Sequence, residues 1–286
     1  YALSLSKEHM HRISGYFKEE DFLVPIGFTD KDVVLSAPRL FSDSFFLQYV
    51  ANMAKIGTTS NGMGVSMSAR TDIRTFFTES SASAFELYNK ASSLLLSKGL
   101  FIRAPYVPIP REVEFIHRER FLDGMIGKQR PVNVIEIAHL WSNAQMNLIG
   151  KALSMGFSQV AKNRKVRELL VRGRDISQKH IAVLNDQLVK ENLPTTSSWD
   201  ADVMDSTIAP FSDKLMLFHV ASLCQTGLGN YGIASSQSMR RDLSLLYTRL
   251  SAEVATYADD MLEVMIHNKW AEQPPLAVDR DELAKV

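Results

Sequence analysis

A chain of 286 residues with 45% hydrophobic content is long enough for two domains of ordinary size and can bury a core. Its 32 basic and 32 acidic side chains cancel, so no net charge attracts nucleic acid or an anionic membrane, and both are disfavoured as partners. A single cysteine, Cys224, excludes an intramolecular disulfide. We therefore expect a protein of a reducing compartment such as the cytoplasm, not one secreted through a disulfide-forming route.

The first part of the chain predicts three amphipathic helices joined by one long and one tight connection. The helices are expected over residues 1–20, 42–69 and 72–97. A proline-bearing strap follows over residues 103–115, and we expect it to be extended and to lie along its own bundle.

The second part of the chain predicts four helices of similar length. They are expected over residues 134–161, 164–191, 212–239 and 242–267, followed by a second strap over residues 273–283. The segment 116–130, which contains Gly124 and Gly127, is the natural joint between the two parts. The sequence therefore predicts a first unit at residues 1–115 and a second at residues 116–286.

The two units are copies of one pattern. Sliding the chain by 170 positions aligns residues 41–113 with residues 211–283 without a gap, and 17 of these 73 pairs are identical. The helix at 134–161 has no counterpart in the first unit. We expect that counterpart to precede Tyr1 in a longer natural chain.

Loop lengths predict the topology of each unit. Two-residue connections allow only antiparallel neighbours, whereas about 20 extended residues reach roughly 65 Å and a 26-residue helix is only about 39 Å long. Residues 192–211 can therefore cross a whole bundle. The predicted fold class is all-α, two tandem ferritin-like four-helix bundles with a long crossover, the first lacking its first helix.

The repeated tripeptide Phe-Ser-Asp, at residues 41–43 and 211–213, predicts a helix start. Ser42 and Ser212 suit the N-cap, the aspartate that follows suits the first turn, and Phe41 with Phe46 would form a hydrophobic staple. Arg70 to Asp72 and Arg240 to Asp242 predict a second set of tight helix junctions.

Several of these motifs together resemble a known family. They are APRLFSD (residues 37–43), GFTDKDV (27–33), RTDI and RRDL (70–73 and 240–243) and EIAHLW (136–141). The chain resembles an uncharacterised family of tandem ferritin-like bundle proteins from endospore-forming bacteria, described as candidate spore coat proteins similar to coat protein F. The resemblance implies the fold, the tandem plan and a link to the spore, and it carries over no catalytic residue and no cofactor.

A ferritin-like bundle raises the question of a carboxylate-bridged metal site, which needs Glu and Glu-x-x-His residues on facing helices. Glu136 and His139 form such a motif, and His180, His219 and Glu253 lie on the other three helices. At about 1.5 Å per residue these side chains do not share one level, and Glu136 also fits a capping box with Asn133. We therefore assign no catalytic, cofactor-binding or metal residue, while metal binding near Glu136, His139 or His180 stays open.

Glycines inside two predicted helices need an explanation. The stretches GTTSNGMG (residues 57–64) and GLGNYG (227–232) each place glycine where it costs about 1 kcal/mol relative to alanine. The main hypothesis is a helix seam at Gly62 with Ser66 and at Gly232 with Ser236. A π-bulge or a niche for a small ligand is the alternative.

The remaining signals are weaker. The basic run at residues 162–174 is typical of a solvated helix face, with docking of an acidic partner as the alternative, and Cys224 fits a core position.

These patterns favour a non-catalytic structural or interaction protein with protein partners or self-association, and the family resemblance implies an association with the spore coat. Two alternatives stay open, a ferritin-like metal-binding oxidoreductase or metal-storage protein, and a carrier of a small apolar ligand between helices.

Overall fold

The computed structural model describes residues 1–123 and 129–285 of an all-helical protein. The predicted joint residues Gly124 and Gly127 lie outside this part of the chain. The long helices are α1 (Ala2–Glu19), α2 (Asp43–Met67), α3 (Thr71–Ser97), α4 (Val134–Val160), α5 (Arg164–Lys190), α6 (Asp213–Gln237) and α7 (Arg241–His267). The described residues contain no strand beyond two isolated bridges, so the all-α prediction is confirmed.

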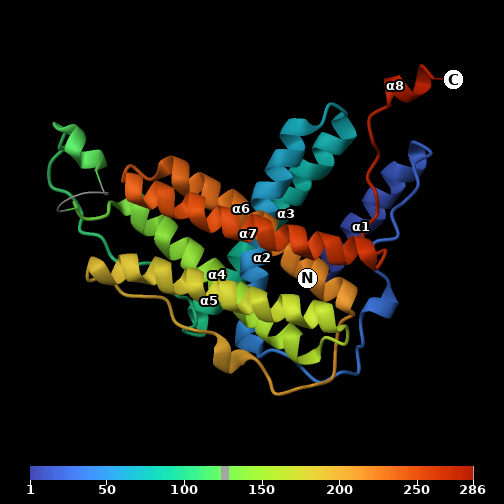
Figure 1. Cartoon of the computed structure of the whole chain (residues 1–286), viewed down its shortest axis with the longest axis horizontal. Coiled ribbons are helices and arrows are strands. Elements are labelled where there is room, and N and C mark those ends of the chain that lie inside the picture. The colour runs from blue at the N-terminus through green and yellow to red at the C-terminus, as the bar shows by residue number, and fades with distance from the viewer. Residues whose placement is uncertain (124–128, 286) are drawn as a thin grey trace.

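The second unit is a four-helix bundle with a long crossover. Helices α4 with α5 and α6 with α7 form hairpins, α4 packs on α6, and α5 packs on α7 (Figure 1). The carboxylate of Asp213 at the start of α6 accepts hydrogen bonds from the backbone N–H groups of Lys162 and Asn163 in the α4–α5 turn. The chain from the far end of α5 must therefore travel the full length of the bundle, as the ferritin-like topology predicts.

The first unit contributes α1, α2 and α3. Helices α2 and α3 form a hairpin, and α1 packs on α3, where the His9 ring lies 5.5 Å from the Phe76 ring. No helix among the described residues occupies the place that α4 has in the second unit. This matches the predicted bundle that lacks its first helix.

The repeated Phe-Ser-Asp motif caps helices and also joins the units. The Ser42 and Ser212 hydroxyls accept hydrogen bonds from the backbone N–H groups of Phe45 and Leu215, as predicted for N-caps. The same hydroxyls donate across the molecule, Ser42 Oγ to Asp202 Oδ1 at 2.5 Å and Ser212 Oγ to Asp32 Oδ1 at 2.6 Å.

Backbone contacts repeat this exchange. The Ser42 N–H donates to the Asp202 carbonyl, and the Ser212 N–H donates to the Asp32 carbonyl, both at 2.9 Å. Antiparallel bridges join Val33 to Phe211 and Phe41 to Val203. Each crossover therefore completes the helix start of the other unit, and we call these contacts the reciprocal clasp.

The core is continuous across the clasp. Leu40, Phe41 and Phe45 of the first unit are buried in a cluster made mainly of second-unit side chains. A Cβ at Gly156 of α4 would come within 2.7 Å of the Phe41 ring, so only glycine allows this approach. The predicted staple is also present, with the Phe41 and Phe46 rings 5.9 Å apart.

The predicted glycine seam is wrong. No described atom lies within 4 Å of a Cβ placed on Gly62 or Gly232, apart from the backbone of the same helix and the adjacent residues, and α2 and α6 are continuous α-helices without a π-bulge. Close approaches occur at other glycines. In the first stretch, a Cβ at Gly57 would lie 3.3 Å from Ala84 Cβ and one at Gly64 would lie 2.6 Å from the Phe77 ring of α3, and on α5 a Cβ at Gly173 would lie 2.2 Å from the Tyr257 hydroxyl. Small residues at Gly62 and Gly232 therefore mark open space and not a packed interface.

The two proline-bearing straps, residues 103–115 and 273–283, are only partly as predicted. The first has no regular secondary structure, as expected, and Ile102, the residue just before it, packs against the core of the second unit. The second strap ends in a short helix, α8 (Arg280–Leu283), which Asp279 caps through the Asp281 and Glu282 N–H groups. The extended prediction for 273–283 is therefore wrong over its last turn.

Candidate functional site

Glu136 is a buried structural carboxylate. It accepts two hydrogen bonds of 2.8 Å from the Arg130 guanidinium and one of 2.9 Å from each of the Asn133 and Arg240 backbone N–H groups. Burial alone would raise the pKa of Glu136, but these four donors hold it below its ordinary value. The predicted capping box is confirmed, and both Glu136 oxygens are already engaged.

Arg240 connects the same end of the bundle. Its side chain is 1% exposed and contacts Asp242 at 2.7 Å, Glu191 at 3.1 Å and the Arg130 carbonyl at 3.1 Å. Its guanidinium therefore joins the starts of α4 and α7 to the end of α5. The counterpart Arg70 lies in the solvent, 41% exposed, against Asp72 and Glu20.

His180 belongs to a separate polar group. Its Nδ1 lies 2.9 Å from the Tyr231 hydroxyl and its Nε2 lies 3.1 Å from Glu253, which also pairs with Lys179. Burial lowers the pKa of His180, and Glu253 offsets this only in part. His139 instead lies 2.8 Å from Gln237.

Of the predicted metal candidates, the structure brings only His180 and Glu253 into contact, and the others lie apart from this pair. Glu136, His139 and His180 have different partners, and His219 lies at the boundary between the units, 2.6 Å from the Tyr49 hydroxyl. Within the ranges 1–123 and 129–285, no group of three or more His, Cys, Asp or Glu side chains is arranged to hold a metal ion.

The buried histidines predict that acid destabilises the fold. Burial lowers the pKa of both His180 and His219 below the ordinary value of 6.5. The unfolded chain therefore binds more protons below that pH, and stability falls as pH is lowered from 7 to 5.5, by about 1.4 kcal/mol per unit of pKa difference.

Melting curves between pH 8 and 5.5 test this expectation. The variant His180→Gln should reduce the slope of melting temperature against pH, whereas His11→Gln at an exposed site should not. An unchanged slope in His180→Gln would contradict the conclusion that burial of His180 makes the protein less stable in acid.

Two weaker sequence signals have structural roles. Cys224 is a free thiol whose burial raises its pKa to about 12, as expected for a core position. In the basic run, Arg164 pairs with Glu168, Arg172 with Asp260 and Arg174 with Asp175. These pairs account for three of its cations within the fold.

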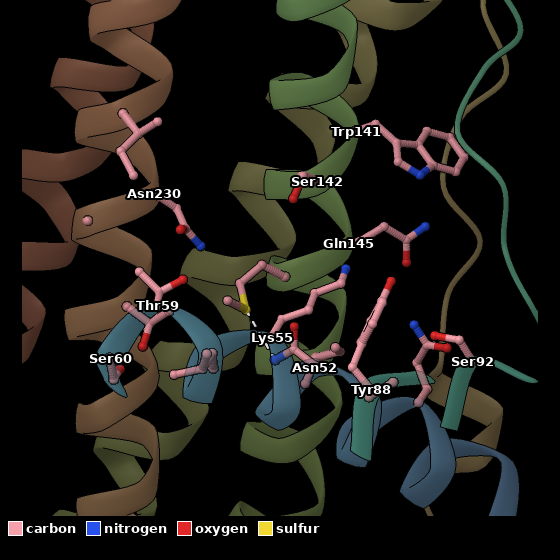
Figure 2. A pocket seen from close by; sticks show the side chains of 18 of the residues that line it. Asn52, Lys55, Thr59, Ser60, Tyr88, Ser92, Trp141, Ser142, Gln145 and Asn230 are labelled. Atoms are coloured by element: carbon pink, nitrogen blue, oxygen red, sulfur yellow. Dashed lines mark hydrogen bonds between the residues drawn. The ribbon is translucent and has the colours of Figure 1, made fainter. Parts of the chain in front are cut away.

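A cavity of about 690 Å³ lies between the two units (Figure 2). Side chains of α2, α3, α4 and α6 line it, together with Phe101 and Ile102 after α3. Its six α6 residues are each 170 positions after an α2 residue that also lines it: 222 and 52, 225 and 55, 226 and 56, 229 and 59, 230 and 60, 233 and 63. The cavity therefore lies between equivalent faces of the repeated helix.

The polar groups of this cavity are incompletely paired. Among the lining residues, the buried side-chain atoms with no hydrogen-bond partner in the described chain are Gln48 Oε1, Ser92 Oγ and both amide atoms of Gln145. Each such atom costs about 1–3 kcal/mol if nothing pairs with it. Figure 2 shows Lys55 and Tyr88 of the first unit reaching toward Gln145 on α4.

The sequence indicates this cavity only through the alternative of a small-ligand niche at the two glycine stretches. Thr59 and Ser60 come from GTTSNGMG, and Gly229 and Asn230 come from GLGNYG, the two stretches for which a small-ligand niche was considered. The α4 contribution had no signal of its own, because Gln145 lies on an otherwise ordinary amphipathic helix.

A family model described as "Protein of unknown function (DUF3231)" matches residues 1–113 and again residues 120–283. The chain belongs to the DUF3231 family. The two matched regions show the tandem plan of this DUF3231 chain, while the division at residues 115 and 116 stays a prediction. No curated protein matches the chain significantly.

Two solved structures are similar to this DUF3231 chain. One, from Bacillus halodurans C-125 and described as a candidate spore coat protein, has 17% identity and a TM-score of 0.48, and covers 52% of this chain and 98% of its own. The other, from Anabaena variabilis ATCC 29413, is a two-domain protein with DJ-1/ThiJ/PfpI-like and ferritin-like domains. It has 11% identity and a TM-score of 0.40, and covers 68% of this chain and 53% of its own.

Proposed function

We propose that this protein is a non-catalytic structural or interaction protein that associates with the spore coat. One observation carries the proposal: the side chains best suited to chemistry hold the fold together. Glu136 binds Arg130 and two backbone N–H groups, His180 binds Tyr231 and Glu253, and His219 binds Tyr49.

The joined units support an interaction role. The reciprocal clasp and the shared core make the two bundles one body, which can present several helical faces to partners or to another copy. The motifs that resemble the family from endospore-forming bacteria supply the link to the coat. None of the described helices has the length and hydropathy needed to cross a membrane.

A fluorescent fusion in a sporulating, endospore-forming bacterium tests the association. We expect the label to gather on the forming spore and to remain there after the mother cell lyses and the spores are washed. A label that stays diffuse in the mother cell and is lost on lysis would contradict a coat role. The fluorophore alone, expressed from the same promoter, is the control.

Elemental analysis of protein purified without chelators tests the non-catalytic part. We expect no stoichiometric iron or manganese. Metal bound at one or two ions per chain and lost in His180→Gln or Glu136→Gln would favour the ferritin-like oxidoreductase or storage alternative. Circular dichroism of each variant separates loss of metal from loss of fold.

A further inference from the structure

The cavity between the units carries one positive charge and no negative one. Of its 24 described lining residues, Lys55 is the only Lys or Arg, and none is Asp or Glu. Lys55 is exposed and forms no ion pair with a described residue, and its Nζ lies 5.8 Å from the centre of the Tyr88 ring. A ligand with one negative charge would find a counter-ion there without meeting a carboxylate.

Neutral polar groups line the same cavity. Three helices supply them: α2 the side-chain amide oxygen of Gln48, α3 the Ser92 hydroxyl, and α4 the unpaired amide of Gln145. Amides and hydroxyls together offer donors and acceptors, so they suit a carboxylate and its neighbouring atoms better than a purely apolar molecule.

The remaining wall is apolar. Trp141 and Ile149 of α4 face the cavity together with Ile56 of α2 and Ile102 after α3. A volume of about 690 Å³ lies within the range of small-molecule sites, which combine such walls with a few placed polar groups.

We propose that this cavity binds a small organic monoanion, a carboxylic acid with an apolar or aromatic body. The carboxylate lies at Lys55 and the unpaired amide and hydroxyl groups, and the body lies against Trp141 and the aliphatic wall. This differs from the carrier of a purely apolar ligand that the sequence suggested. It also does not depend on the proposed coat role.

Isothermal titration with three matched probes tests the charge preference. The probes are 4-phenylbutanoate, 4-phenylbutanamide and 4-phenylbutylamine, which are anionic, neutral and cationic at pH 7.5 and share one body. We expect the carboxylate to bind, the amide to bind about tenfold more weakly, and the amine to show no binding. Equal affinities, or no binding of the carboxylate, would overturn the proposal.

Lys55→Gln tests the counter-ion. It should weaken binding of 4-phenylbutanoate about tenfold and leave the amide unchanged, because only the carboxylate loses its charged partner. Lys7→Gln, at an exposed site on α1 outside the cavity, should change neither affinity. An equal loss for both probes, or no loss, would refute the role of Lys55.

A pair of glycine variants tests the location. Gly229 and Gly232 both lie on α6, and a Cβ at either meets no described atom within 4 Å beyond its own helix backbone and adjacent residues, but only Gly229 lines the cavity. Gly229→Leu should fill the cavity and reduce carboxylate binding at least tenfold, whereas Gly232→Leu should not.

Both variants should keep the wild-type melting temperature or raise it, because leucine favours a helix more than glycine does. This reverses the destabilisation expected for Gly232→Leu from the seam hypothesis. Undiminished binding in a folded Gly229→Leu protein would show that the probe binds elsewhere, such as an exposed apolar surface.

Discussion

Replacing Phe45 by alanine is expected to lower the free energy of unfolding by about 3–5 kcal/mol, because it leaves a large cavity around which the core relaxes only in part. Phe45 is 0% exposed, and its ring stacks on Phe41 at 4.9 Å and meets the edge of Trp199 at 6.3 Å. Phe45 belongs to the first unit and Trp199 to the second crossover. The variant should therefore loosen both units together.

The neighbouring residue provides the control. Phe46 is 39% exposed, and its replacement by alanine should cost about 1 kcal/mol. Guanidinium unfolding followed by circular dichroism and tryptophan fluorescence measures both variants. Equal losses for Phe45→Ala and Phe46→Ala, or a first unit that unfolds separately in the wild type, would contradict a continuous core.

Replacing Arg240 by methionine is expected to cost about 3–5 kcal/mol, because it removes a guanidinium that is 1% exposed and leaves the acceptors of a largely buried network without their charged donor. Asp242 and Glu191 would lose their guanidinium partner, and the Arg130 carbonyl would lose a donor. Lysine should not restore the loss, because it lacks the planar fork that reaches several acceptors at once.

The repeat supplies a matched control for this variant. Arg70 occupies the equivalent position and forms the same pair with its own Asp72, but its side chain is 41% exposed. Arg70→Met should cost less than about 1 kcal/mol, as is usual for surface ion pairs. Chemical denaturation of the two variants side by side would refute the burial argument if Arg70→Met proved as costly as Arg240→Met.

Much of the fold could be predicted because its signals are local. Ser42, Ser212 and Asn133 are caps whose partners lie within three residues, and they place helix starts within one or two positions of those observed. The crossover followed from loop length alone. The last turn of the second strap was missed because a four-residue helix capped by Asp279 has no hydrophobic period.

The contacts between units could not be predicted in the same way. Asp32 and Asp202 lie 170 positions apart, in DKDV and DADV, but nothing in the sequence indicates that each would bind the serine of the other copy. The cavity could not be predicted for the same reason, since Lys55, Gln145 and Gly229 line one cavity only once α2 lies across α4 and α6. A conformationally permissive glycine signals open space and close packing equally well, so Gly232 was misread.

The pairing of Tyr49 with His219 has a consequence for how such a chain can evolve. These residues occupy the same position in the two copies and touch each other, so in a dimer of identical subunits this position would meet itself. Covalent fusion removes that restriction. The two copies of this position are encoded separately here, so a phenol faces an imidazole where a homodimer must place like against like.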